Sequence, residues 1–270
     1  MKTILVPTDL SDVSEYALDV AVEIAKKKGA TVVLLKKIIF PTIEYTIIEN
    51  EFYDTKDEFY KYLTQESKER LQDMVDKPSY RDVKFRFKII RDNESLAKLM
   101  ANQSADLIVM GSTGATGWKE WTNGSNAEHV VREVSCPVLV VKTPVNAFRR
   151  VVFAIDFQNT QFVKSALELL DKAQIDPHFV YVDNGMKKFD SNVLWAKMGK
   201  LALELGFSNY QFIIHESSTV EKGIVDYARD VEADIIVMYT HARKGFEHFI
   251  YGSVAEDVVN HADVAVMVGH

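Results

Sequence analysis

The residues best suited to chemistry lie in a glycine-containing stretch in the first half of the chain. Residues 106–110 form a short apolar run with β-branched members, which predicts a buried strand. The pattern G-x2-G-x9-G-S follows over residues 111–125, and Ser125 is a candidate N-cap for an amphipathic helix over residues 126–134. Because glycine permits tight turns and a helix N-terminus favours negative charge, this order of strand, loop and helix predicts a phosphate-binding site.

A second polar segment follows the first predicted strand. Residues 3–6 read as a buried strand that ends at residues 7–9, and residues 11–28 carry apolar side chains at helical spacing. With a further strand over residues 31–35, this succession predicts a parallel strand pair joined by a right-handed crossover, in a sheet covered by helices on both faces. Ligands of such sheets bind beyond the carboxyl ends of the strands, so residues 7–9 and the glycine loop converge on a predicted pocket.

The pattern of the first half starts again after a short polar, proline-containing connection. Each half supplies five strand-like and four helix-like segments, which indicates an internal duplication and two α/β domains, residues 1–145 and residues 146–270. Residues 150–156 parallel residues 2–9, residues 233–238 nearly repeat residues 105–110, and residues 252–259 parallel residues 124–131.

The second half lacks part of the glycine pattern. Tyr239 and Ala242 stand where the first half has Gly111 and Gly114, and Ala154 replaces Pro7. Side chains at the two glycine positions disfavour positive-φ turns and crowd a phosphate that approaches the backbone. Although Asp156 and Gly252-Ser253 remain, we predict a degenerate site in the second domain, kept for architecture or for another ligand.

The complete loop pattern, together with the strand-like residues 136–141 that follow it, resembles the nucleotide-binding signature of the universal stress protein family. The resemblance implies two tandem doubly wound α/β domains. Each would hold a five-stranded parallel sheet, in the order 3-2-1-4-5, with helices on both faces. The nucleotide-binding loop would be intact in the first domain and degenerate in the second.

In family members that bind ATP, the matching positions border the nucleotide. The resemblance therefore implies that Pro7, Thr8 and Asp9 lie against adenosine and that Lys37 borders adenine through its backbone, that Met110, Gly111, Thr113 and Gly114 border ribose and phosphate, and that Gly124, Ser125, Asn126 and Ala127 take the phosphate tail. Two of these depart from the family pattern, Asn126 and Lys37, and the family often has valine at the latter position.

The function expected from this resemblance is a nucleotide-responsive stress module that binds ATP, with magnesium or manganese on the phosphates. No G-x-S-x-G elbow, G-x-x-x-x-G-K-[ST] loop or H-E-x-x-H helix occurs in the sequence, so we expect little or no hydrolysis and no catalytic residue. Two alternatives stay open: an enzyme of the adenine-nucleotide α-hydrolase-like group, and a nucleotide-free scaffold. His215, His241 and His248 lack a compact ligand spacing, so we expect no protein-held metal.

Composition narrows the class of protein. The chain has 270 residues, of which 47% are hydrophobic, enough for packed cores. A formal charge of −7 argues against a broad surface for nucleic acid. No apolar run approaches the roughly 20 residues that a membrane helix needs, and no signal peptide pattern opens the sequence, so we expect a cytoplasmic protein. A single cysteine, Cys136, excludes an intrachain disulfide, and we expect it to pack rather than react.

Two surfaces bear on assembly. Each half ends in an apolar strand, residues 138–141 and 264–268, and such a strand would be a sticky edge if it stayed unpaired. We therefore predict that the two domains dock on each other through these strands. Homodimerisation is left open, with Trp118, Trp121 or the aromatic residues within 49–62 as candidate surfaces.

Local signals predict further features. Ser11 and Gly29 mark the start and stop of the first helix, and Asn93 or Ser95 begins a later one. Residues 83–90 alternate apolar and basic side chains, which predicts a half-exposed strand near a sheet edge. Its basic residues would share one face, either as protection of that edge or as an anion site.

Overall fold

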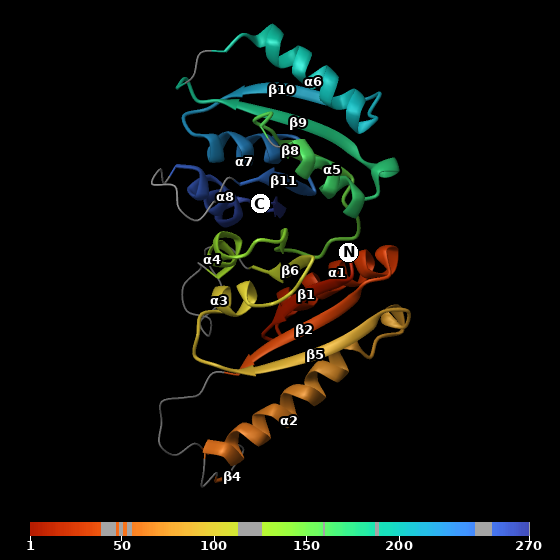
Figure 1. Cartoon of the computed structure of the whole chain (residues 1–270), viewed down its shortest axis with the longest axis vertical. Helices are drawn as coiled ribbons and strands as arrows, with labels where there is room; N and C mark the ends of the chain where they lie inside the picture. The colour runs from red at the N-terminus through yellow and green to blue at the C-terminus, as the bar shows by residue number, and fades with distance from the viewer. Residues whose placement is uncertain are drawn as a thin grey trace.

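A computed structural model describes residues 1–38, 47–48, 51–52, 56–112, 126–158, 160–186, 189–240 and 250–269. Ten of its strands form one continuous sheet, in the order β10-β9-β8-β11-β12-β7-β6-β1-β2-β5 (Figure 1). The first half of the chain contributes the lower part of the sheet in this view, and the second half the upper part. None of the described helices is both long and apolar enough to cross a bilayer.

The elements of the first half alternate between strand and helix. In chain order they are β1 (Thr3–Thr8), α1 (Asp12–Lys28), β2 (Thr31–Ile38), β3 (Ile47–Ile48), β4 (Glu51–Phe52), α2 (Lys56–Val75), a 3-10 turn (Pro78–Tyr80), β5 (Lys84–Arg91), α3 (Leu96–Ala101), β6 (Leu107–Gly111), α4 (Asn126–Glu133) and β7 (Val138–Val141). Strands β3 and β4 form a separate two-stranded hairpin.

The second half repeats this alternation without the hairpin. Its elements are β8 (Arg150–Ala154), α5 (Thr160–Leu169), a 3-10 turn (Lys172–Gln174), β9 (Asp176–Asp183), α6 (Ser191–Leu205), β10 (Gln211–Glu216), α7 (Val220–Asp230), β11 (Ile235–Tyr239), α8 (Ile250–His261) and β12 (Ala265–Gly269). Within each half the five strands are parallel and lie in the order 3-2-1-4-5, so the predicted fold class is confirmed.

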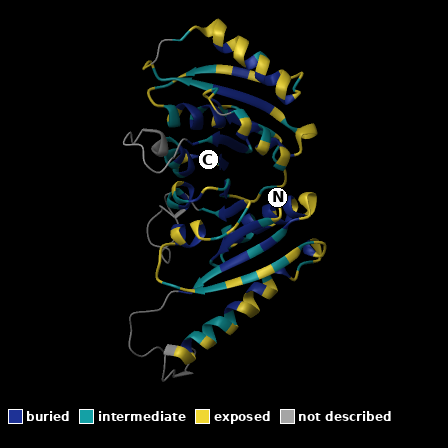
Figure 2. Cartoon of the chain, in the orientation of Figure 1, coloured by how far each residue is buried: buried dark blue, intermediate teal, exposed yellow. Residues whose placement is uncertain are grey.

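Alternate residues of the central strands bury their side chains on opposite faces of the sheet, as the pleat requires. Ile4 and Val6 of β1 pack under α1 and α2, whereas Leu5 packs on the face that α3 and α4 cover. In the second half α5 and α6 continue the first layer, and α7 and α8 the second. Both hydrophobic layers run across the junction of the halves, and the buried residues follow the sheet (Figure 2).

Local signals set the ends of several elements. Ser11 caps α1 by accepting the N–H of Ser14, and Gly29 ends it in the left-handed conformation at φ 63°. Ser95 caps α3 in the same way. Strand β5 lies at one edge of the sheet with exposed basic residues alternating with half-buried apolar ones, which confirms the predicted edge strand.

The two halves join through their closing strands. β7 and β12 pair antiparallel, with Leu139 opposite Met267, and all their side chains are buried. The sequence prediction that these strands cover each other is confirmed by this pairing. Beside them α4 packs on α8, where the Asn260 amide donates to the Glu128 carboxylate at 2.9 Å. The exact boundary between the domains, drawn at residues 145 and 146 from the sequence, stays a prediction.

Candidate functional site

The end of β1 forms a turn held by several hydrogen bonds. The side chain of Thr8 is buried, with its Oγ1 2.8 Å from Oγ of Ser14, and it accepts the backbone N–H of Leu10 at 3.0 Å. Leu10 adopts a positive φ of 75°, a conformation that is costly for a branched side chain and persists only where surrounding contacts enforce it. Helix α1 begins directly after this turn, so its N-terminus is fixed against the strand end.

Asp9 lies at the centre of this turn. Its carboxylate accepts the N–H of Ser11 at 3.0 Å, close to the N-terminus of α1. Its backbone carbonyl accepts a hydrogen bond from Nζ of Lys36 at 3.3 Å. A carboxylate and an ammonium group therefore stand together at the carboxyl ends of β1 and β2.

The end of β6 meets the start of α1 at Gly111. A Cβ atom at this position would lie 2.6 Å from the carbonyl oxygen of Val13, so the helix backbone packs where any larger residue would have a side chain. Met110 precedes it with a buried side chain on the opposite face of the sheet. Gly111 is thus needed for close backbone packing, a reason that the sequence pattern alone did not reveal.

The strands β1 and β6 separate toward their carboxyl ends. Their register pairs Ile4 with Leu107 and Leu5 with Ile108 and stops there, whereas β1 stays paired with β2 through Thr8. Pro7 has no N–H to donate to the ladder, which explains why the pairing with β6 ends before it. The connections after β1 and β6 leave toward opposite faces, so this separation is the switch point at which ligands of doubly wound sheets bind.

The structure describes only some of the remaining predicted site residues. The Lys37 ammonium donates to the carbonyl of Glu94, so the side chain is directed toward the segment before α3. Lys36 is the last residue of β2 that pairs with β1. Lys37 follows it, so the Lys37 backbone lies at the carboxyl end of β2, beside the switch point. Ala127 is buried in the first turn of α4, where Asn126 begins the helix. Residues 113–125, with Thr113, Gly114, Gly124 and Ser125, lie outside the described residues, as do Trp118 and Trp121.

In the second domain the corresponding strands stay together longer. β8 pairs with β11 through Ala154, the residue that replaces Pro7. Tyr239 occupies the position of Gly111, and its ring centroid lies 6.1 Å from that of Phe162 on α5. The partner of Tyr239 on β12 is Gly269, where a Cβ atom would lie 2.1 Å from the Phe162 ring. Two aromatic rings thus pack together at the strand end where the first domain has Gly111.

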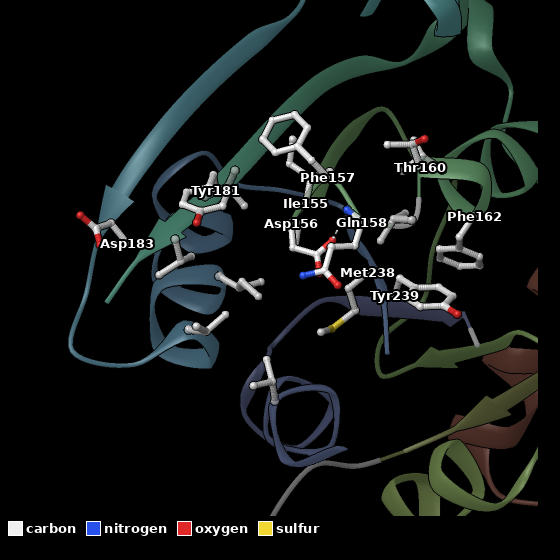
Figure 3. Close-up of a pocket in the computed structure, with 18 of the residues that line it drawn as sticks. Ile155, Asp156, Phe157, Gln158, Thr160, Phe162, Tyr181, Asp183, Met238 and Tyr239 are labelled. Atoms are coloured by element: carbon white, nitrogen blue, oxygen red, sulfur yellow. Dashed lines mark hydrogen bonds between the residues drawn. The ribbon is translucent and has the colours of Figure 1, made fainter. Parts of the chain in front are cut away.

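A cavity of about 240 Å³ opens beyond the carboxyl ends of β8, β9 and β11 (Figure 3). Its wall is mainly aliphatic and aromatic, with polar groups from Asp156, Gln158, Thr160, Asp183 and Asn184. The prediction of a degenerate second site concerned its phosphate loop, and it gave no indication that the strand ends would still enclose a cavity. Residues 241–249, which include His241, Ala242 and His248, lie outside the described residues.

The strand registers of the two domains place Val182 at the position equivalent to Lys37, a correspondence that the sequence analysis missed. Pro7 pairs with Leu35 and Ala154 with Val180, so Tyr181 and Val182 correspond to Lys36 and Lys37. Val182 is the residue type that the family resemblance leads one to expect there. Alignment of residues 176–183 with residues 31–38 could have found it.

Other reactive side chains play structural roles. Burial raises the pKa of the half-buried Cys136 thiol, so this side chain is a poor nucleophile at neutral pH. The His215 ring packs 6.1 Å from that of Tyr227. Within the described part of the chain, no group of three or more histidine, cysteine and carboxylate side chains is arranged to hold a metal ion.

Comparison with known proteins agrees with this architecture. The family model described as "Universal stress protein family" matches residues 1–142 and again residues 147–270. Universal stress protein MJ0531 of Methanocaldococcus jannaschii is 34% identical over 143 residues, which are 53% of this chain and 83% of that protein. Universal stress protein MJ0577 of the same organism is 32% identical over 155 residues, 52% of this chain and 94% of that protein.

A solved structure shares the fold of both halves together. The crystal structure of a universal stress protein from Archaeoglobus fulgidus DSM 4304 superposes with a TM-score of 0.70 at 22% identity, covering 99% of this chain and 95% of that chain. The family model matches twice, and the described sheet repeats one strand order twice. The chain therefore belongs to the universal stress protein family and carries two of its domains in tandem.

Proposed function

We propose that the first domain binds an adenine nucleotide, ATP, at the carboxyl ends of β1, β2 and β6. The observation that carries the proposal is the contact at Gly111, where the backbone of β6 meets the first turn of α1 beside the separated strands. A flat base fits such a gap between strand ends. Gly111 lets the first turn of α1 pack close to β6 and so fixes the helix N-terminus beside the gap. The buried Thr8 and the Asp9 turn would fix one wall of this pocket.

The phosphates would extend toward α4. In this proposal the glycine loop over residues 113–125 supplies backbone N–H groups, and the N-terminus of α4 adds the favourable end of its dipole. The Lys36 ammonium, which already bonds the Asp9 carbonyl, adds positive charge at the same edge. A divalent cation, magnesium or manganese, would arrive on the phosphates and neutralise part of their charge.

We propose further that the protein acts in the cytoplasm as a nucleotide-responsive stress module with little or no hydrolysis. A phosphate loop without a water-positioning base predicts retention of the nucleotide rather than turnover. The rival is an enzyme that cleaves ATP while it activates a substrate, and a nucleotide-free scaffold is the third candidate.

One experiment separates these three candidates. Mass spectrometry of gently purified protein is expected to find a co-purified adenine nucleotide, and incubation with ATP and magnesium is expected to give less than one turnover per chain. Multiple turnovers that Asp9→Ala abolishes would support the enzyme. If purified protein carries no nucleotide and does not bind added ATP at millimolar concentration, the scaffold is favoured and the proposal fails.

A further inference from the structure

Helix α6 exposes apolar side chains to solvent at the end of the molecule that lies beyond β9 and β10 (Figure 1). The described residues expose six large hydrophobic side chains, and all except Met1 lie within residues 186–213. They include Trp195, which is 51% exposed, and Leu203, which is 80% exposed. Apolar surface that gathers at one place in this way marks a contact site.

The counterpart of α6 in the first domain does not share this surface. Helix α2 occupies the equivalent place in the duplication, beside the edge strand β5. Its exposed side chains are charged or carry amides, and they include Lys61, Gln65, Lys68, Glu69 and Gln72. An apolar outer face is therefore not a requirement of the fold, and the α6 surface calls for an explanation of its own.

Trp195, Gly199 and Leu203 form a stripe along the outer side of α6, here called the α6 stripe. The three residues are four positions apart, a spacing that places them one above another on a helix. The Trp195 ring packs edge to face on Phe212 of β10, with the ring centroids 4.7 Å apart. This contact holds the half-exposed indole in one position, so that it is ready for a partner.

Gly199 makes a notch in the middle of the stripe. A Cβ atom at this position would meet no atom within 4 Å, so no contact among the described residues requires a glycine here. A glycine inside a helix lowers stability relative to alanine. Its use is the space that it leaves between Trp195 and Leu203, into which a second helix can pack closely.

The stripe is complementary to a copy of itself. Gly199 lies midway between Trp195 and Leu203, so two antiparallel copies of α6 that cross at Gly199 bring Trp195 of each chain against Leu203 of the other. A twofold axis generates both contacts at once. Away from α6 and β10, the described residues expose no second group of large hydrophobic side chains that would match the stripe.

Charge also favours a second copy as the partner. A twofold contact brings each charged group near the axis against its own copy. The α6 stripe has no charged residue, and its exposed neighbours Asn192 and Ala196 are uncharged too. Strand β5, at the other edge of the sheet, exposes Lys84, Arg86 and Lys88, which would repel their own copies. The second domain is therefore the end at which this chain can pair with itself.

We propose that two copies of this protein associate through α6, antiparallel and with the twofold axis at Gly199. A helix of 15 residues is about 22 Å long and covers a few hundred Å² per chain, less than the roughly 800 Å² of a standard interface. The dimer is accordingly weak and reversible, with a dissociation constant on the order of 10–100 µM. It does not depend on nucleotide binding in either domain.

Sedimentation equilibrium of the full-length protein from about 1 to 500 µM tests the proposal. Leu203→Glu is expected to weaken dimerisation roughly 10- to 100-fold, because it places a carboxylate against the apolar face of the partner. Gly199→Leu should have a similar effect, since its side chain holds the two helices apart. Val193→Glu is the matched control: it adds the same charge to the same helix but off the stripe, and should leave the dimer unchanged.

A double variant tests the antiparallel register. Trp195→Arg combined with Leu203→Glu places opposite charges about 12 Å apart along one helix, too far to pair there, but directly opposite each other across the twofold axis. This variant is expected to dimerise roughly tenfold more tightly than Leu203→Glu alone, because two ion pairs form between the chains.

The proposal is overturned if the protein stays monomeric throughout this concentration range, or if Leu203→Glu and Gly199→Leu dimerise as tightly as the parent. It is also overturned if Val193→Glu weakens the dimer as much as Leu203→Glu does. A double variant that dimerises no better than Leu203→Glu contradicts the antiparallel register. Thermal unfolding at micromolar concentration identifies any variant that merely disrupts folding, which is not expected for Leu203 because its side chain is exposed.

Discussion

The two domains are alike at the amino ends of their strands and different at the carboxyl ends. Asp106 accepts the backbone N–H groups of Lys2 and Thr3, and Asp234 accepts those of Arg149 and Arg150 in the same arrangement. These bonds lower the pKa of Asp106, as expected for a carboxylate that ties two strands together. At the other end one domain has a proline and a glycine, and the other has an alanine and a tyrosine.

Two pairs of residues, Pro7 with Ala154 and Gly111 with Tyr239, account for this difference between two otherwise similar domains. Pro7 ends the pairing of β1 with β6 after Leu5, whereas Ala154 lets β8 pair with β11 to the end of the strand. Gly111 allows the α1 backbone to pack close to β6, whereas Tyr239 places an aromatic ring at the equivalent position of β11. Ligands of doubly wound sheets bind beyond the carboxyl ends of the strands, so a difference at those ends is the kind expected to change ligand preference.

The largest expected effect concerns the junction of the domains. Residues 1–145 expressed alone would expose β7, whose four residues are fully buried beside β12 in the intact chain. We expect this half to dimerise or aggregate through that edge, as an unpaired apolar strand does. Light scattering after size exclusion measures this directly. A half that stays monomeric well above micromolar concentration contradicts the account of docking, and residues 146–270 provide the matched comparison through β12.

Gly111→Ala tests the close packing at the first site. Its Cβ would lie 2.6 Å from the Val13 carbonyl oxygen, so α1 must shift. We expect a loss of about 1–3 kcal/mol in the free energy of unfolding, as for other overpacked sites, and a clear drop in ATP affinity. Denaturant unfolding and titration with ATP check both quantities. Tyr239→Ala is the counterpart in the second domain; it should lose stability through the Phe162 contact but keep ATP affinity.

The pair Glu128 and Glu256 occupies equivalent positions of α4 and α8 at the junction. Burial and the neighbouring Glu128 carboxylate raise the pKa of Glu256 to about 7, with Asp257 acting in the same direction and Arg132 against it. Burial opposes ionisation of Glu128, but hydrogen bonds from Asn260 and Glu256, together with the nearby His129 and Arg132, outweigh it and lower the pKa of this carboxyl. Glu128 is therefore the ionised member and Glu256 holds the proton.

The sign of the pH dependence follows from the raised pKa. The contribution of Glu256 to stability is fully present below the ordinary glutamate pKa of 4.5 and is lost as pH rises through about 7. Glu256→Gln cannot ionise, so we expect its stability relative to the parent protein to rise by on the order of 1–3 kcal/mol between pH 5 and pH 8. Thermal or denaturant unfolding across this range measures it, and a difference that does not change with pH refutes the assignment.

The smallest expected effect is that of a glycine-to-alanine substitution at Gly199 in the second domain. Gly199 lies within α6, and a Cβ there would meet no atom within 4 Å. Gly199→Ala is therefore expected to stabilise the protein by about 0.5–1 kcal/mol, opposite in sign to Gly111→Ala. Denaturant unfolding is the measurement, and a loss of stability would mean that the surroundings of Gly199 are tighter than described.

Sequence patterns predicted most of the fold because its signals are local or repeated. The cap at Ser11, the stop at Gly29 and the alternation in β5 each follow from a few neighbouring residues. Because the second half repeats the pattern of the first, the same signals predicted the second domain. The apolar strand that closes each half predicted the pairing of β7 with β12.

The sites were predicted less completely. Glycine spacing indicated a turn at Gly111, but its contact with Val13 depends on two elements that lie far apart in the chain. The second-domain cavity was missed because its wall comes mostly from apolar residues, such as Val182 and Val237, that read as core from the sequence. Only their placement at the strand ends distinguishes them from core residues.

The central claim is that the two domains carry different sites, and the stoichiometry of ATP binding tests it most directly. Equilibrium dialysis with labelled ATP and magnesium is expected to give one ATP per chain. Gly114→Val should remove this binding, because a β-branched residue resists the turn and blocks the phosphate, whereas Ala242→Val should leave it intact. Two ATP molecules per chain, or equal losses of affinity in the two variants, would contradict the account.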